Sequence, residues 1–173
     1  MKKQLLIGAL AATAASTALF QAPEAQAAEW TIKEDSAEKR PWDVGVLVGL
    51  PFGYGSFGLA PIGILDIPIV DKGFVPINDS FDIEVGAYTF LLFDPFAFGI
   101  TPFAGARWNF HLQKKWDAYA ALRLGVYINN GAAFNLNAVL GTTYKFNETW
   151  GIRGELGGGN GGAGLSAGVN IAF

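Results

Sequence analysis

The sequence contains no cysteine and a single histidine, His111. A cysteine-ligated or histidine-rich metal site is therefore unsupported, and we expect neither a metal nor another cofactor. Charged residues are also scarce, at 16% of the chain against roughly 25% in ordinary soluble domains. No basic tract is present beyond the N-terminus, which argues against nucleic acid as a partner.

Long apolar runs are missing beyond residue 20, although 51% of the residues are hydrophobic. A membrane-spanning helix needs about 20 consecutive apolar residues, so the later chain predicts none. Apolar residues instead alternate with small or polar ones. This composition is typical of a membrane β-barrel, in which one face of each strand contacts lipid.

The N-terminus has the pattern of a secretory signal peptide. Lys2 and Lys3 precede an apolar run over residues 5–20, and Ala-Gln-Ala at residues 25–27 is a small-x-small cleavage site. An uncleaved membrane anchor is the alternative, but the run is shorter than the roughly 20 residues that span a bilayer. We therefore predict that residues 1–27 are removed on export.

Residues 28–42 are charged and lack periodicity, so we predict a flexible periplasmic lead-in. From residue 43 onward the alternation has a period of two, which predicts strands with one apolar and one small or polar face. Turn-rich stretches separate the strands, among them PFGYGSFG, Asn130-Gly131 and GGGNGG. Eight segments result, at about residues 43–50, 58–70, 81–90, 99–112, 118–129, 132–146, 150–156 and 163–173. Prolines in the second segment leave its register open.

We predict an all-β fold, an eight-stranded antiparallel up-and-down transmembrane β-barrel over residues 43–173. A soluble lipocalin-like barrel also has eight strands, but its apolar residues would face inward and its charges outward. With both termini in the periplasm, aromatic residues gather at the predicted periplasmic ends, where a membrane-interface girdle is expected. The predicted girdle is Trp108, Phe110, Trp116, Tyr144, Phe146 and Trp150, with Phe173 nearby.

The inward faces carry charges of both signs: Asp82, Glu84, Arg107, Arg123, Lys145, Arg153 and Glu155, with Asp66 a further candidate. The interior of an eight-stranded barrel is just wide enough for side chains to fill, so we predict a salt-bridged network that closes it. The alternative is a narrow channel for ions or small solutes. Inward glycines keep this alternative open, because they remove volume that side chains would fill.

The final segment alternates to Phe173, with an outward face of Leu165, Ala167, Val169, Ile171 and Phe173. It resembles the C-terminal assembly signal of bacterial outer-membrane barrels. With the signal peptide and eight segments, the chain resembles the small outer-membrane barrels of the OmpA/OmpX type, without a family-specific motif. The resemblance implies the outer membrane of a Gram-negative bacterium and contact with lipid and the barrel-assembly machinery. The balanced inward charges favour a structural or interaction role. Short predicted external loops depart from the adhesive members of this class.

We do not expect an enzyme. Some small outer-membrane barrels modify acyl chains, which requires a histidine with a serine nucleophile or an acidic partner near the outer leaflet. His111 is predicted at the opposite, periplasmic end. None of the mature serines, Ser36, Ser56, Ser80 and Ser166, is adjacent to it in the sequence.

Overall fold

The computed structural model describes residues 30–34, 39–52, 57–93, 95–160 and 162–173. The predicted signal peptide, at residues 1–27, lies outside these described residues. Within them, no helix is long and apolar enough to cross a membrane.

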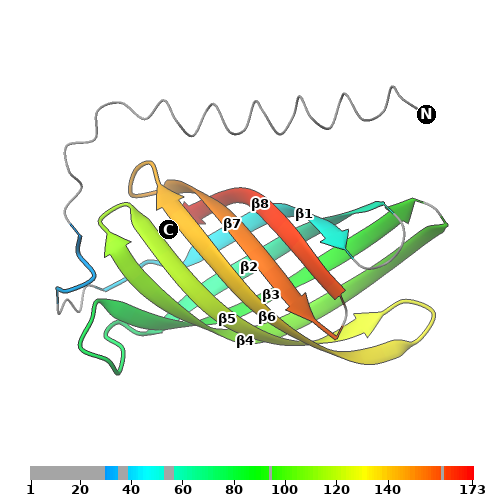
Figure 1. Ribbon diagram of the computed structural model, residues 1–173, viewed down its shortest axis with the longest axis horizontal. Coiled ribbons are helices and arrows are strands. Elements are labelled where there is room, and N and C mark those ends of the chain that lie inside the picture. The colour runs from blue at the N-terminus through cyan, green and yellow to red at the C-terminus, as the bar shows by residue number, and fades with distance from the viewer. Residues whose placement is uncertain (1–29, 35–38, 53–56, 94, 161) are drawn as a thin grey trace.

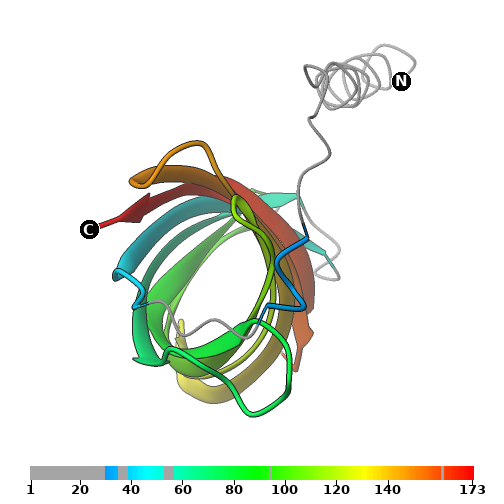
Figure 2. The same cartoon turned by 90° about the vertical axis from the view of Figure 1, so that its left-hand side faces the viewer.

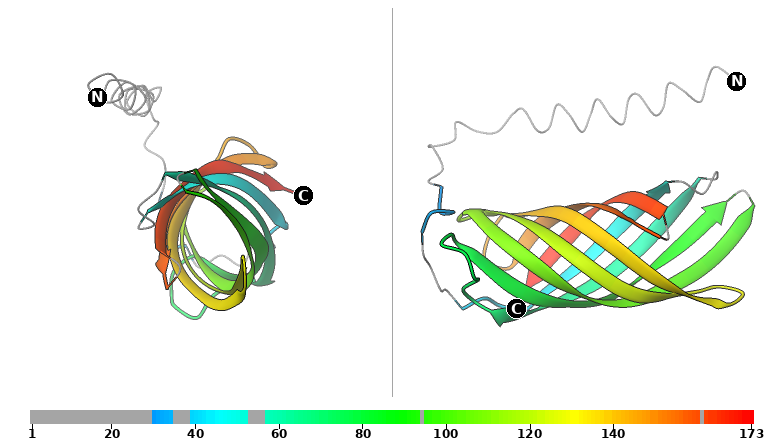
Figure 3. Two further views of the ribbon diagram at one scale, coloured as in Figure 1. Left: turned by 90° about the vertical axis from the view of Figure 1, so that its right-hand side faces the viewer. Right: turned by 60° about the horizontal axis from the view of Figure 1, so that its bottom comes forward.

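Eight antiparallel strands follow one another and close into a barrel (Figure 1). They are β1 (Asp43–Phe52), β2 (Gly58–Val70), β3 (Asp79–Phe93), β4 (Phe96–Gln113), β5 (Trp116–Ile128), β6 (Ala132–Lys145), β7 (Trp150–Gly159) and β8 (Gly162–Ala172). Each strand pairs with its neighbour in the sequence, and β8 pairs with β1 from Ala172↔Asp43 to Ala163↔Phe52. Figure 2 shows the resulting ring end-on, and Figure 3 shows the oblique course of the strands. The predicted fold class is confirmed.

The exterior of the barrel is apolar, whereas its interior holds the buried charged side chains together with a smaller apolar cluster of Leu47, Ile64 and Phe103. Leu122 and Leu124 are both 51% exposed, whereas Arg123 between them is 3% exposed. Successive side chains of a strand point to opposite faces, so this alternation places the arginine in the space inside the barrel, the lumen. A soluble barrel would show the reverse arrangement.

Two hairpins are tighter than predicted. The sequence predicted a loop near residues 91–98, but β3 and β4 continue until Phe93 pairs with Phe96. The GGGNGG stretch was predicted as a loop, yet Gly159 pairs with Gly162. A Cβ on Gly159 would collide with a carbonyl oxygen of β6, and Gly162 has a φ of 103°, which L side chains rarely adopt. Glycine therefore serves strand pairing here as well as the turn.

The register of β2, which the sequence left open, turns Asp66 inward. Asp66 pairs with Glu84 of β3 and is 1% exposed. The register shifts between Pro68 and Val70, where proline cannot donate a backbone hydrogen bond to the ladder. The irregularity thus comes after the buried acid and leaves its inward direction intact.

We call the end of the barrel that holds Asp43 and Phe173 the base, and the opposite end the far end. The lead-in was predicted to be flexible, but its described residues 30–34 are bound to the base. The Thr31 N–H donates to the carbonyl of Leu112 at 2.9 Å, and the Asn78 N–H donates to the carbonyl of Ile32 at 2.9 Å. The lead-in therefore crosses the ends of β3 and β4.

The predicted girdle residues lie on the outside of the base. The Trp108 ring is 4.7 Å from that of Phe110 and 5.4 Å from that of Phe81, centroid to centroid. The remaining four members of the predicted girdle are exposed: Trp116, Tyr144, Phe146 and Trp150. Trp30 of the lead-in adds a ring 6.3 Å from Trp116, which the sequence did not predict.

Candidate functional site

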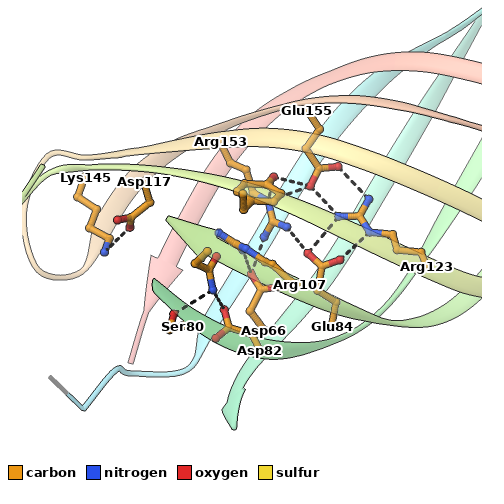
Figure 4. Close-up of polar contacts among 12 residues, drawn as sticks. Asp66, Ser80, Asp82, Glu84, Arg107, Asp117, Arg123, Lys145, Arg153 and Glu155 are labelled. Atoms are coloured by element: carbon orange, nitrogen blue, oxygen red, sulfur yellow. Dashed lines mark hydrogen bonds and ion pairs between the residues drawn. The ribbon is translucent and has the colours of Figure 1, made fainter. Parts of the chain in front are cut away.

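Arg153 of β7 lies at the centre of the lumen and is 1% exposed. Its Nη2 donates to Glu84 at 2.6 Å and its Nε donates to Glu155 at 2.9 Å. Its Nη1 donates to Asp66 (Figure 4). One guanidinium therefore binds three carboxylates, from β2, β3 and β7.

Arg123 of β5 bridges two of the same acids. Its Nε and Nη2 donate to the two oxygens of Glu84, at 2.8 and 3.2 Å. Its Nη1 and Nη2 donate to the two oxygens of Glu155, at 2.9 and 2.7 Å. Two parallel bonds to each acid match the planar fork of a guanidinium, which is the strongest form of this pair.

Tyr119 of β5 joins these ion pairs to a third arginine. Its hydroxyl donates to Glu155 at 2.7 Å and accepts from the Nε of Arg153 at 2.8 Å. Arg107 of β4 lies over its ring, 3.8 Å from the centroid, and donates to Asp66 at 2.8 Å. A Cβ on Gly141 would collide with the Tyr119 ring, so glycine at this position makes room for it.

We call this cluster the central network: Asp66, Glu84, Arg107, Tyr119, Arg123, Arg153 and Glu155. Its three guanidiniums balance its three carboxylates, and each of these residues is at most 6% exposed. A buried charge without a partner is costly, so the mutual pairing is what allows these groups to occupy the interior.

The structure gathers most of the predicted charges but not all of them. Lys145 lies apart from the central network, near the end of β6, and pairs with Asp117 at 2.7 Å with its side chain 35% exposed (Figure 4). Asp82 faces the lumen beside the network and accepts from Asn109 at 2.7 Å. Alternation correctly gave the inward direction of both residues, but it did not give their depth along the barrel axis.

His111 has a serine partner, which the sequence did not predict, and an acidic partner as well. Its Nδ1 is 2.6 Å from Asp117, and its Nε2 is 3.0 Å from the hydroxyl of Ser80. Ser80 is 31 residues away in the chain but pairs with Asn109, two residues before His111 on the same face of β4. Sequence adjacency was therefore the wrong criterion, because strand pairing determines which side chains meet.

These three residues have the connectivity of a serine nucleophile, its base and an orienting acid. A nucleophile must contact its substrate, however, and the Ser80 side chain is entirely buried, with 0% exposure. The Asn109 amide also donates to the Ser80 oxygen at 3.3 Å. The hydroxyl of Thr31 donates to the carbonyl of His111 at 3.0 Å and ties the lead-in to the same place. The arrangement in the structure is a closed hydrogen-bonded clamp at the base.

The central network lies between two cavities. The base cavity, of about 770 Å³, reaches Arg107 and is bordered by charged residues such as Lys114, Lys145 and Glu148. The far-end cavity, of about 90 Å³, reaches Arg123 and Glu155. Over the part of the chain that the structure describes, no residue lines both cavities. The network thus separates them.

Comparison with known protein families finds no matching family model, and no curated protein matches either. Among solved structures, the chain is similar to one described as "De novo design of transmembrane beta-barrels", with a TM-score of 0.59 and 14% identity. The match covers 80% of this chain and 100% of the other. The fold is that of a transmembrane β-barrel. The likeness does not single out the OmpA/OmpX type, which stays a prediction from the sequence.

Proposed function

We propose that this protein is an integral outer-membrane barrel whose lumen is closed by the central network and whose role is structural or interactive. The observation that carries the proposal is the pairing of three guanidiniums with three carboxylates across the interior. Side chains from β2, β3, β4, β5 and β7 meet there, so the network ties together strands on different sides of the ring. Such contacts across the lumen stabilise a barrel and block the passage of solutes through it.

Several features support an outer-membrane location. The exposed exterior is rich in leucine, valine, isoleucine and phenylalanine, which suits contact with lipid. Aromatic residues lie outside the base, as at a membrane–water interface. The signal-peptide pattern supports export. The alternating strand up to Phe173 supports recognition by the barrel-assembly machinery in a Gram-negative bacterium.

The same geometry supports a role without catalysis. The only histidine is held between Asp117 and Ser80, and the serine hydroxyl is buried in the clamp rather than presented to a cavity. We therefore assign the clamp a structural role, in which it fixes the lead-in and the ends of β3, β4 and β5.

Conductance in a planar lipid bilayer tests the closed lumen directly. A denaturing gel first verifies that the refolded protein is heat-modifiable. We then expect the bilayer that contains it to show no current steps. The central network lies between the base cavity and the far-end cavity, which share no lining residue among those described. Discrete and reproducible current steps from the folded protein would contradict the proposal and favour the narrow channel.

A further inference from the structure

The far-end cavity has a glycine-rich wall. Gly49, Gly157, Gly162 and Gly164, from β1, β7 and β8, line it together with Ser166. The three atoms that a Cβ on Gly164 would approach most closely all belong to the adjacent strand, the nearest being the Leu50 oxygen at 3.1 Å. At Gly49 the nearest atoms likewise belong to the neighbouring strands, at 3.3 Å. The nearest contacts at these two glycines thus come from neighbouring strands and not from across the lumen.

Apolar side chains face the cavity from β2 and β3. Ile62, Tyr88 and Phe90 line it. Phe90 is stacked on Tyr127 with centroids 5.0 Å apart, and the Tyr88 ring is 5.8 Å from that of Phe103. Each ring is thus braced by a second aromatic residue, so the apolar wall is preorganised.

Amide groups of β6 complete the lining. Asn135 is 6% exposed and accepts a hydrogen bond from the Tyr88 hydroxyl. The Oδ1 atom of Asn137 is buried and has no hydrogen-bond partner among the described residues. A buried acceptor without a donor is unfavourable. Asn137 lines the cavity, so rotation of its amide would let a guest molecule with an N–H or O–H group relieve this cost.

The floor of the cavity does not favour a charged guest. Arg123 and Glu155 line it, but each is already bound within the central network. An ion entering here would lose water without gaining a free counter-charge. A neutral guest loses less hydration free energy when it enters the cavity.

We propose that the far-end cavity binds small, uncharged molecules that join one aromatic ring or a short aliphatic group to a hydrogen-bond donor. Small-molecule sites typically combine apolar walls with a few placed polar groups, as this cavity does. Its volume of about 90 Å³ limits the guest to about one ring. The donor meets Asn137 and the apolar part lies against Tyr88 and Ile62. This inference does not depend on the membrane location or on whether the lumen conducts.

Phenol is a suitable probe, and toluene is a matched molecule of similar shape without the donor. The experiment titrates each into the refolded, isotope-labelled full chain and follows the side-chain amide signals of Asn135 and Asn137 by NMR. A site-specific signal is needed because both molecules also partition into detergent. We expect saturable shifts with phenol and weaker binding of toluene, by roughly 2- to 10-fold for one hydrogen bond.

Two matched leucine variants separate the site from general partitioning, and a third variant tests the hydrogen bond. Ala60 lines the cavity on β2, so Ala60→Leu should fill it and abolish saturation. Ala106→Leu adds the same atoms to the exposed outer face of β4 and should leave binding unchanged. Asn137→Ala should remove the preference for phenol over toluene, with the Asn135 signal as the reporter. This variant keeps the test decisive if Ala60→Leu does not fold.

Absent saturation in the wild-type protein would overturn the inference. So would equal binding by Ala60→Leu, or an unchanged preference in Asn137→Ala. A folded barrel that gives no current and binds no phenol would leave the proposed structural function standing, so the two proposals fail separately.

Discussion

Arg153 binds three carboxylates. Its removal would leave these buried acids without one of the positive charges that they share. Breaking a buried ion pair by removing one partner costs about 3–5 kcal/mol. We expect Arg153→Met to lower the free energy of unfolding by an amount in that range, measured by urea titration of tryptophan fluorescence in lipid vesicles. Lys145→Met is the control, since its ion pair is partly exposed at the base and contributes about 0–1 kcal/mol. Similar losses in both variants would contradict a special role for the central network.

Gly141 is the second position where one residue controls the network. Gly141→Ala should displace the Tyr119 ring and weaken its bonds to Glu155 and Arg153, because the new methyl group occupies the same space. Overpacking of this kind costs about 1–3 kcal/mol. Gly154→Ala adds a methyl group on the outer face, where the nearest atom is 4.0 Å away, and should be close to neutral in the same urea titration. Equal effects would show that Tyr119 is not held as described.

At the scale of the strands, Phe173 tests the assembly proposal. Its N–H donates to the carbonyl of Trp42 at 3.0 Å, while its side chain is 68% exposed and free to be recognised. We expect Phe173→Ala to lower the amount of inserted protein and to leave precursor in the periplasm, as seen by cell fractionation. Phe74→Ala removes another exposed phenyl group at the base and should insert normally. Normal surface levels of Phe173→Ala would remove the support for a terminal assembly signal.

The strands were the most predictable part of the molecule. A period of two determines which residues face inward, and this information is local, so Glu84, Arg107, Arg123 and Arg153 could all be assigned to the lumen from the sequence. The clamp of Ser80, His111 and Asp117 could not, because its members meet through the register of β3, β4 and β5. Tyr119 lies on the inward face of β5 by the same alternation, but its hydrogen bond to Glu155 depends on the exact depth of that residue. The sequence pattern gives the face of a strand and leaves the height of each residue undetermined.

At the scale of the whole molecule, a change in the central network should affect the stability of the barrel and leave its conductance unchanged. Arg123→Ala removes four hydrogen bonds to Glu84 and Glu155. Under the proposed function it should lower the urea midpoint clearly while the membrane current stays at baseline, because Arg153 still spans the interior. A channel would behave differently, with a changed ion selectivity in a barrel of normal stability. Both measurements on one preparation decide between them.

The order in which the charges appear along the chain has a consequence for how the barrel is made. Within the central network, β2 and β3 bring Asp66 and Glu84, then β4 and β5 bring Arg107 and Arg123, and β7 adds one charge of each sign. A four-stranded sheet of β2–β5 is therefore already neutral in these groups, and β7 leaves the balance unchanged. An unpaired charge is costly in an apolar phase. Pairing of Arg107 with Asp66 and of Arg123 with Glu84 therefore lowers the electrostatic cost of the open sheet before β8 meets β1.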